Sequence, residues 1–169
     1  MTSFAKLVGP LLKREGGYVN HPRDRGAATN MGITQRTYTM WRVSQKLGYK
    51  DVRDITKAEA TAIYRVNYWD EARCEDLPES LQEIHFDSAV NHGVSRAIKL
   101  LQEASGVVVD GIFGAKTLAA STKTDVHLLF ARYIIARYDF YGEIIFRDRS
   151  QLEFISGWMR RMRHFSQLK

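Results

Sequence analysis

The chain has 169 residues, of which 44% are hydrophobic, and these values predict a folded globule and exclude a disordered protein. The formal net charge is +6, which favours an anionic partner: nucleic acid, an acidic lipid surface and the bacterial wall all fit. Cys74 is the only cysteine, so an intramolecular disulfide is excluded and the fold does not depend on an oxidising compartment.

Helical periodicity dominates the chain. Apolar positions on one face predict a helix over residues 3–14, and Gly16 is placed to end it in a left-handed turn. The glycine-rich stretch 17–33 predicts a short β-ribbon plus loop. Further helices are expected over 34–47, 56–69, 80–91, 95–105, 114–121, 125–145 and 150–165.

Two of these helices begin with the spacing of a capping box, one at Thr56–Glu59 and one at Ser80–Glu83. Gly93 is expected to end the second of them. The pattern contains no linker rich in Pro, Gly or Ser and no repeat, so we expect one mainly α domain spanning residues 1–169.

The start of the chain does not have the pattern of a secretion signal. Lys6, Lys13 and Arg14 interrupt the apolar positions, and no stretch is long and apolar enough to span a membrane. We therefore expect synthesis in the cytoplasm without a cleavable signal peptide. If the protein works outside the cytoplasm, it then needs a holin-like pore or a dedicated export route.

The candidate chemistry lies after the first helix. Hydrolysis of a glycosidic bond can be divided between two carboxyl groups, one that protonates the leaving oxygen and one that activates water. Glu15 follows an apolar helix and precedes two glycines, which suits the acid, and Tyr18 is placed to wall its pocket. Asp24 lies in a polar loop between two arginines and suits the ionised partner, while Thr29 is placed to hold the attacking water. On spacing alone, a solvated helix end and a turn residue remain an open alternative.

Two stretches of the chain resemble a known family. The run Glu15-Gly16-Gly17-Tyr18-Val19-Asn20, followed by Asp24, Gly26 and Thr29-Asn30-Met31-Gly32-Ile33-Thr34, resembles the signature of the glycoside hydrolase family 108 N-acetylmuramidases, which include secretion activators and phage endolysins. The positions Phe86–Gly93, Leu100–Gln102, Asp110–Gly114 and Thr117-Leu118 resemble the predicted peptidoglycan domain of that family.

This resemblance implies a lysozyme-like fold with the short β-ribbon next to the active-site cleft. It also implies a catalytic lobe over about residues 4–85 and a peptidoglycan-binding lobe over about 86–165 packed on it. The family activity is cleavage of the β-1,4 bond between N-acetylmuramic acid and N-acetylglucosamine, without a cofactor. Glu15 carries over as the acid. Asp24 and Thr29 also rest on the catalytic trio of phage-type lysozymes, from which we expect an inverting reaction.

The expected substrate-binding residues are Tyr18, Asn30, Tyr68 and Asn91. Asn91 can bond a sugar N-acetyl or hydroxyl group, or cap its own helix, and both interpretations stay open. Tyr68 belongs to a stripe with Tyr64 and Trp69 that suits either sugar stacking or a core. No metal site is expected, because His85 and His92 are two helical turns apart, too far for one ion.

The expected partners are the glycan strands of peptidoglycan, bound by a monomer. The arginines of the last helix favour either an ordinary solvated face or weak contact with an anionic membrane surface. We expect no nucleic-acid partner, because no recognition motif accompanies the positive charge. A non-catalytic, peptidoglycan-binding secretion accessory protein is the alternative function.

Overall fold

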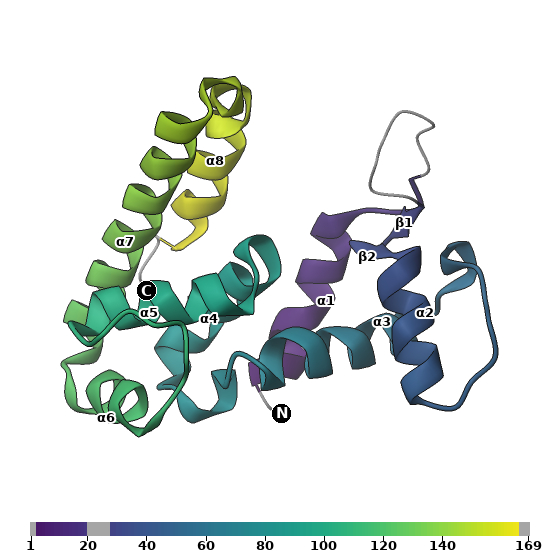
Figure 1. Ribbon diagram of the computed structural model, residues 1–169, viewed down its shortest axis with the longest axis horizontal. Coiled ribbons are helices and arrows are strands. Elements are labelled where there is room, and N and C mark those ends of the chain that lie inside the picture. Colours follow the sequence, from purple (N-terminus) through teal and green to yellow (C-terminus); the bar gives the residue numbers. More distant parts are fainter. Residues whose placement is uncertain (1–2, 20–27, 166–169) are drawn as a thin grey trace. The chain divides into compact units, whose positions relative to one another are not determined.

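The protein is described by a computed structural model that covers residues 3–19 and 28–165. The chain divides into two compact units, Met1–Glu71 and Ala72–Lys169. The fold class is confirmed as mainly α with one short two-stranded antiparallel hairpin (Figure 1). Packing of two lobes into one lysozyme-like domain stays a prediction.

The first unit surrounds a core filled from its helices. Its elements are α1 (Ser3–Glu15), β1 (Thr29–Asn30), β2 (Ile33–Thr34), α2 (Gln35–Ser44), the 3-10 helix η1 (Val52–Asp54), α3 (Lys57–Tyr64) and the π-helix η2 (Arg65–Asp70). One face of α1 is buried, and at its start Phe4 meets the edge of Trp69 with ring centroids 5.4 Å apart. This contact holds the first and last helices of the unit together.

A tight turn forms the hairpin. Asn30 pairs with Ile33, and the two residues between them, Met31 and Gly32, both have positive φ, 49° and 72°. Two consecutive left-handed residues give the turn whose twist matches an antiparallel hairpin, and glycine at the second of them removes the steric cost there. The hairpin lies beside the C-terminal end of α1 (Figure 1).

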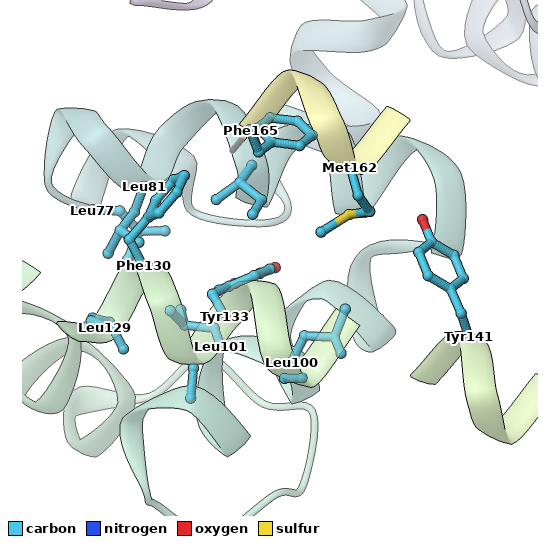
Figure 2. Close-up of a cluster of buried hydrophobic side chains, with 13 residues drawn as sticks. Leu77, Leu81, Leu100, Leu101, Leu129, Phe130, Tyr133, Tyr141, Met162 and Phe165 are labelled. Atoms are coloured by element: carbon cyan, nitrogen blue, oxygen red, sulfur yellow. The ribbon is translucent and has the colours of Figure 1, made fainter. Parts of the chain in front are cut away.

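The second unit is entirely helical in the part of it that the structure describes. Its elements are η3 (Cys74–Asp76), α4 (Glu79–His92), α5 (Val94–Ser105), α6 (Ala115–Lys123), α7 (Val126–Arg147), η4 (Arg149–Phe154) and α8 (Ile155–Phe165). A continuous apolar cluster joins α4, α5, α7 and α8, with Leu81, Leu100, Tyr133 and Phe165 among its members (Figure 2).

Most of the predicted helices are confirmed, with shifts at their ends. The capping box at Thr56 is present, since Glu59 N donates to Thr56 Oγ1 and Thr56 N donates to Glu59 Oε2. The one predicted at Ser80 is wrong, because α4 already begins at Glu79 with Pro78 at the capping position. Proline fixes the backbone there without a side-chain hydrogen bond.

Three predicted helices differ in form or length. The helix expected over 56–69 changes to π geometry at Arg65, the one expected over 34–47 ends at Ser44, and the last begins as 3-10 helix up to Phe154. The π geometry leaves Trp69 buried against α1 while Val66 stays exposed. Among the described helices, none is both long and apolar enough to cross a bilayer.

Candidate active site

Glu15 is the last residue of α1 and is half-buried. The helix stops there because Gly16 takes a φ of +83°, a conformation that residues with a side chain rarely adopt. The predicted left-handed turn is thus confirmed. The apolar face of α1, through Leu11 and Leu12, is buried in the unit and fixes the end of the helix that carries the carboxyl group.

The chain that leaves Glu15 returns to pair with the hairpin. Val19 and Thr29 exchange two backbone hydrogen bonds, Val19 N to Thr29 O at 2.8 Å and Thr29 N to Val19 O at 2.9 Å. This bridge places half-buried Thr29 beside the segment that follows Glu15. Asp24 falls in residues 20–27, outside the described part of the chain, so its place in the site stays a prediction.

The hairpin turn packs directly on Glu15. A Cβ built on Gly32 would lie 3.1 Å from Glu15 Oε2, 3.2 Å from Glu15 Cβ and only 2.5 Å from the hydroxyl oxygen of Tyr64. The side chains of Glu15 and Tyr64 therefore both lie close to the Gly32 backbone, in space that a side chain at position 32 would occupy. The residue at this position is a glycine. The contacts show that it lets the hairpin approach the candidate acid.

Two stacked tyrosines stand beside this contact. Tyr64 donates its hydroxyl hydrogen to Met31 O at 3.0 Å, and its ring stacks on Tyr68 with centroids 5.3 Å apart. Burial, followed by the negative charge of Glu15, raises the pKa of Tyr68. Tyr68, predicted as a substrate contact, is thus electrostatically coupled to Glu15. Tyr64, whose stripe was interpreted mainly as core, also belongs to the site.

Two other predicted site residues, Tyr18 and Asn30, make contacts with η1. Arg53 donates to the Tyr18 hydroxyl at 3.2 Å and its guanidinium lies 4.7 Å from the centre of that ring. Asn30 is buried and donates from Nδ2 to the carbonyls of Val52 and Arg53, at 3.2 and 3.0 Å. These contacts anchor the hairpin to η1. Contact of either residue with substrate stays a prediction.

Asn91 lies in the second unit, near the end of α4. Its side chain is exposed and donates to Asp87 O at 2.6 Å, so the amide does back-bond to its own helix. A role for it in binding sugar stays a prediction.

The neighbouring Asp87 serves the inside of the second unit. Its carboxylate lies 2.9 Å from the buried Arg137 and 3.2 Å from Arg161 of α8. Burial alone lowers the pKa of Arg137, but the charge of Asp87 outweighs it and the net shift is upward. Arg161, one of the arginines considered for membrane contact, is therefore already engaged in an ion pair.

Glu59 is a second partly buried carboxylate of the first unit, and it is fully occupied. It accepts hydrogen bonds from Tyr38, Arg42 and the Thr56 backbone at 2.8 Å each. Burial raises the pKa of Glu59, but the hydrogen bonds from Thr56 and Tyr38 and the charge of Lys50 outweigh it and bring the value to about 2. The Glu59 carboxylate therefore stays ionised and serves to hold neighbouring elements together. It is not available as a proton donor.

The arrangement thus offers one half-buried carboxyl group, held between a glycine turn and an aromatic pair. Among the described residues, no three side chains of His, Cys, Asp or Glu converge where a metal ion could be held. The chemistry that Glu15 itself can supply is proton transfer to a bound substrate.

Comparisons with known proteins place the chain in a family. Residues 8–93 match the family described as glycosyl hydrolase 108, and residues 96–163 match the family described as a predicted peptidoglycan domain. Among solved structures, that of Brucella abortus SagA is 38% identical with a TM-score of 0.79, and the match covers 96% of this chain and 91% of that one. No curated protein matches. The glycosyl hydrolase match spans Glu15, the hairpin and the tyrosine pair, and over its length the chain belongs to the glycosyl hydrolase 108 family.

Proposed function

We propose that this glycosidase is an N-acetylmuramidase that cleaves the β-1,4 bond between N-acetylmuramic acid and N-acetylglucosamine in peptidoglycan. In this proposal Glu15 donates the proton to the leaving oxygen. The observation that carries it is the packing of Glu15 Oε2 against Gly32 beside Tyr64, within the family match. This packing fixes the carboxyl group at the end of a rigid helix.

The remaining steps need a water molecule on the opposite face of the sugar. We assign its activation to Asp24 and its positioning to Thr29, which gives single displacement with inversion at the anomeric carbon. The second unit, matched to the predicted peptidoglycan domain, would keep the enzyme on the insoluble wall. The protein acts, in this proposal, on the periplasmic face after release through a pore or an export route.

The test compares wild type with Glu15→Gln in a turbidity assay on purified peptidoglycan sacculi. The amide keeps the size of the side chain and cannot donate the proton, so we expect lysis to fall by about 100-fold or more. Glu71→Gln is the matched control, an exposed carboxylate in the same unit, and should lyse like wild type. Equal lysis by wild type and Glu15→Gln would mean that Glu15 is not the acid.

The products decide the bond and the stereochemistry. New reducing ends that are N-acetylmuramic acid support the proposed bond, whereas N-acetylglucosamine ends contradict it. NMR of the first product formed should show the α-anomer. A β-anomer formed first would mean that the reaction retains configuration.

A further inference from the structure

A groove lies between α2 and η2 in the first unit. Its volume is about 440 Å³, within the range of about 300–1,000 Å³ that is usual for small-molecule sites. It is lined by residues of α2, the residue that caps this helix and two consecutive residues of η2: Thr37, Met40, Trp41, Ser44, Gln45, Val66 and Asn67. The site built around Glu15 uses none of these residues.

The lining favours a neutral ligand. None of its side chains is charged, in a chain whose net charge is +6. Trp41 and Asn67 are half-buried, and within the described residues neither the indole N–H nor the side-chain amide has a hydrogen-bond partner. Within the described part of the chain, these two polar groups are available to a ligand in a partly apolar groove.

The aromatic surface in the groove is held in place. The Trp41 ring stacks on Tyr38, with centroids 6.3 Å apart and planes 13° from parallel. Tyr38 is fully buried and donates to Glu59 Oε1 at 2.8 Å. An indole fixed in this way loses little conformational freedom when a ligand packs on it.

These features together fit a sugar. A pyranose ring has C–H faces that pack on an aromatic ring, and its edges carry hydroxyl groups that need hydrogen-bond partners. An acetamido group would pair with the Asn67 amide and set its methyl against the exposed side chains of Met40 and Val66.

We propose that the α2–η2 groove is a second saccharide site, which binds N-acetylated hexosamine oligosaccharides apart from the Glu15 centre. The π-helical form of η2 agrees with this, because π-helical turns occur often at functional sites. The segment carries Val66 and Asn67 in the groove and Tyr68 at Glu15. Binding here does not depend on hydrolysis at Glu15.

The test titrates N,N′,N″-triacetylchitotriose into the Glu15→Gln protein and follows the indole N–H signals by NMR. The chain has three tryptophans, and Trp41→Phe assigns the signal of interest. We expect the Trp41 signal to shift with saturation. Maltotriose, which lacks acetamido groups, should shift it less at equal concentration.

Three variants locate the ligand. Asn67→Ala should weaken the affinity read at Trp41 by about fivefold, the effect of one lost hydrogen bond. Val66→Ala in the groove should weaken it as well. Val43→Ala, an exposed residue of α2 outside the lining, should leave it unchanged. Circular dichroism confirms that each variant is folded.

The proposal is overturned if the Trp41 signal does not move, or if it moves equally in Asn67→Ala. It is also overturned if the signal shifts with protein concentration alone while sedimentation shows dimers, because the groove then binds a second copy of the chain. Wall lysis by wild type and Glu15→Gln is measured separately. Loss of the groove proposal therefore leaves the muramidase proposal intact, and the reverse also holds.

Discussion

A missing methyl group at position 32 determines how closely the hairpin approaches the candidate acid. The turn brings the Gly32 backbone so close to Tyr64 that a Cβ would clash with the hydroxyl, and close enough to Glu15 that a Cβ would force its side chain to shift. The position of the Glu15 side chain therefore depends on its contact with the Gly32 backbone as well as on its own helix.

Gly32→Ala should lower both activity and stability. The added Cβ would stand 2.5 Å from the Tyr64 hydroxyl, and the φ of +72° is unfavourable for alanine. We expect a loss of about 2–4 kcal/mol in the free energy of unfolding and a displaced Glu15. Thermal unfolding and wall lysis measure the two effects.

Gly106→Ala is the matched control for backbone strain. Its φ is +69° but open space surrounds the added Cβ, so it should lose only about 1 kcal/mol. The double variant Gly32→Ala/Tyr64→Phe removes the clashing hydroxyl and should recover part of the loss. Equal destabilisation by the two glycine variants would show that the contact with Glu15 and Tyr64 is unimportant.

At this scale the sequence points to Glu15 as the candidate acid but does not predict the side chains around it. A glutamate at a helix end before two glycines is a local pattern. The meeting of Gly32 with Tyr64 depends on how separate segments pack, which no local spacing reveals. The available signal was the pair Tyr64 and Tyr68, four residues apart on one helix, which a core stripe also produces.

At the scale of elements, one carboxylate ties together the helices that flank the site. Glu59 of α3 accepts hydrogen bonds from Tyr38 and Arg42 of α2, and it also forms an ion pair with Lys50, in the segment between α2 and α3. The same group closes the capping box of its own helix. This group therefore joins α2, which forms one wall of the groove, to α3, the helix that continues into η2.

The Glu59 cluster predicts a pH dependence of the first unit. Its pKa is about 2 in the folded protein against an ordinary value of 4.5, so the unfolded chain takes up the proton first. The stabilisation is present above about pH 4.5 and is lost as the pH falls toward 2. Since the group is close to the surface, Glu59→Gln should cost about 1–2 kcal/mol at pH 7.

Urea unfolding followed by amide NMR signals of the first unit measures this effect. Glu153→Gln, at an exposed position of the second unit, should leave these signals unchanged. A Glu59→Gln protein with the stability of wild type at both pH 7 and pH 3 would contradict the assignment.

Element positions were predictable because apolar spacing and capping residues are local. The Thr56 box is an example, and Gly93 ends α4 as expected, with a φ of 85°. Forms that depend on packing were not predictable. Over the six residues of η2, the apolar spacing in the sequence does not distinguish a π-helix from an α-helix. The 3-10 helix before α8 follows a cap at Asp148, and the sequence pattern of that cap is also found in ordinary turns.

At the scale of the whole molecule, the two units respond to acid differently. In the second unit, His85 is fully buried and donates from Nε2 to Ala72 O at 2.9 Å, while His92 lies edge-on to Phe140 and Tyr141. Burial lowers the pKa of each histidine from 6.5 to about 4. Both groups are neutral in the folded unit.

The second unit should therefore lose stability at a higher pH than the first. Between about pH 6.5 and 4 the unfolded chain binds protons that the folded unit does not bind. The free energy of unfolding therefore falls across that range, by about 3 kcal/mol per histidine. His92→Phe removes one of these groups and should make the fall shallower. The measurement is unfolding followed by amide signals of this unit at pH 7, 5 and 4.

His127→Phe is the matched control, because His127 is exposed on α7 and should leave the pH dependence unchanged. A slope between pH 6.5 and 4 that is the same in His92→Phe and wild type would assign the acid sensitivity to other groups.

Helix α4 lies within the hydrolase family match in sequence, but it packs in the second structural unit. The hydrolase family match continues to residue 93, whereas Leu81 and Ile84 of this helix lie in the core of the unit that begins at Ala72. A genetic crossover between residues 93 and 96 would transfer the second module without the helix that fills its interior. We expect such recombinants to fail to fold, because the second module would lack the core side chains Leu81 and Ile84.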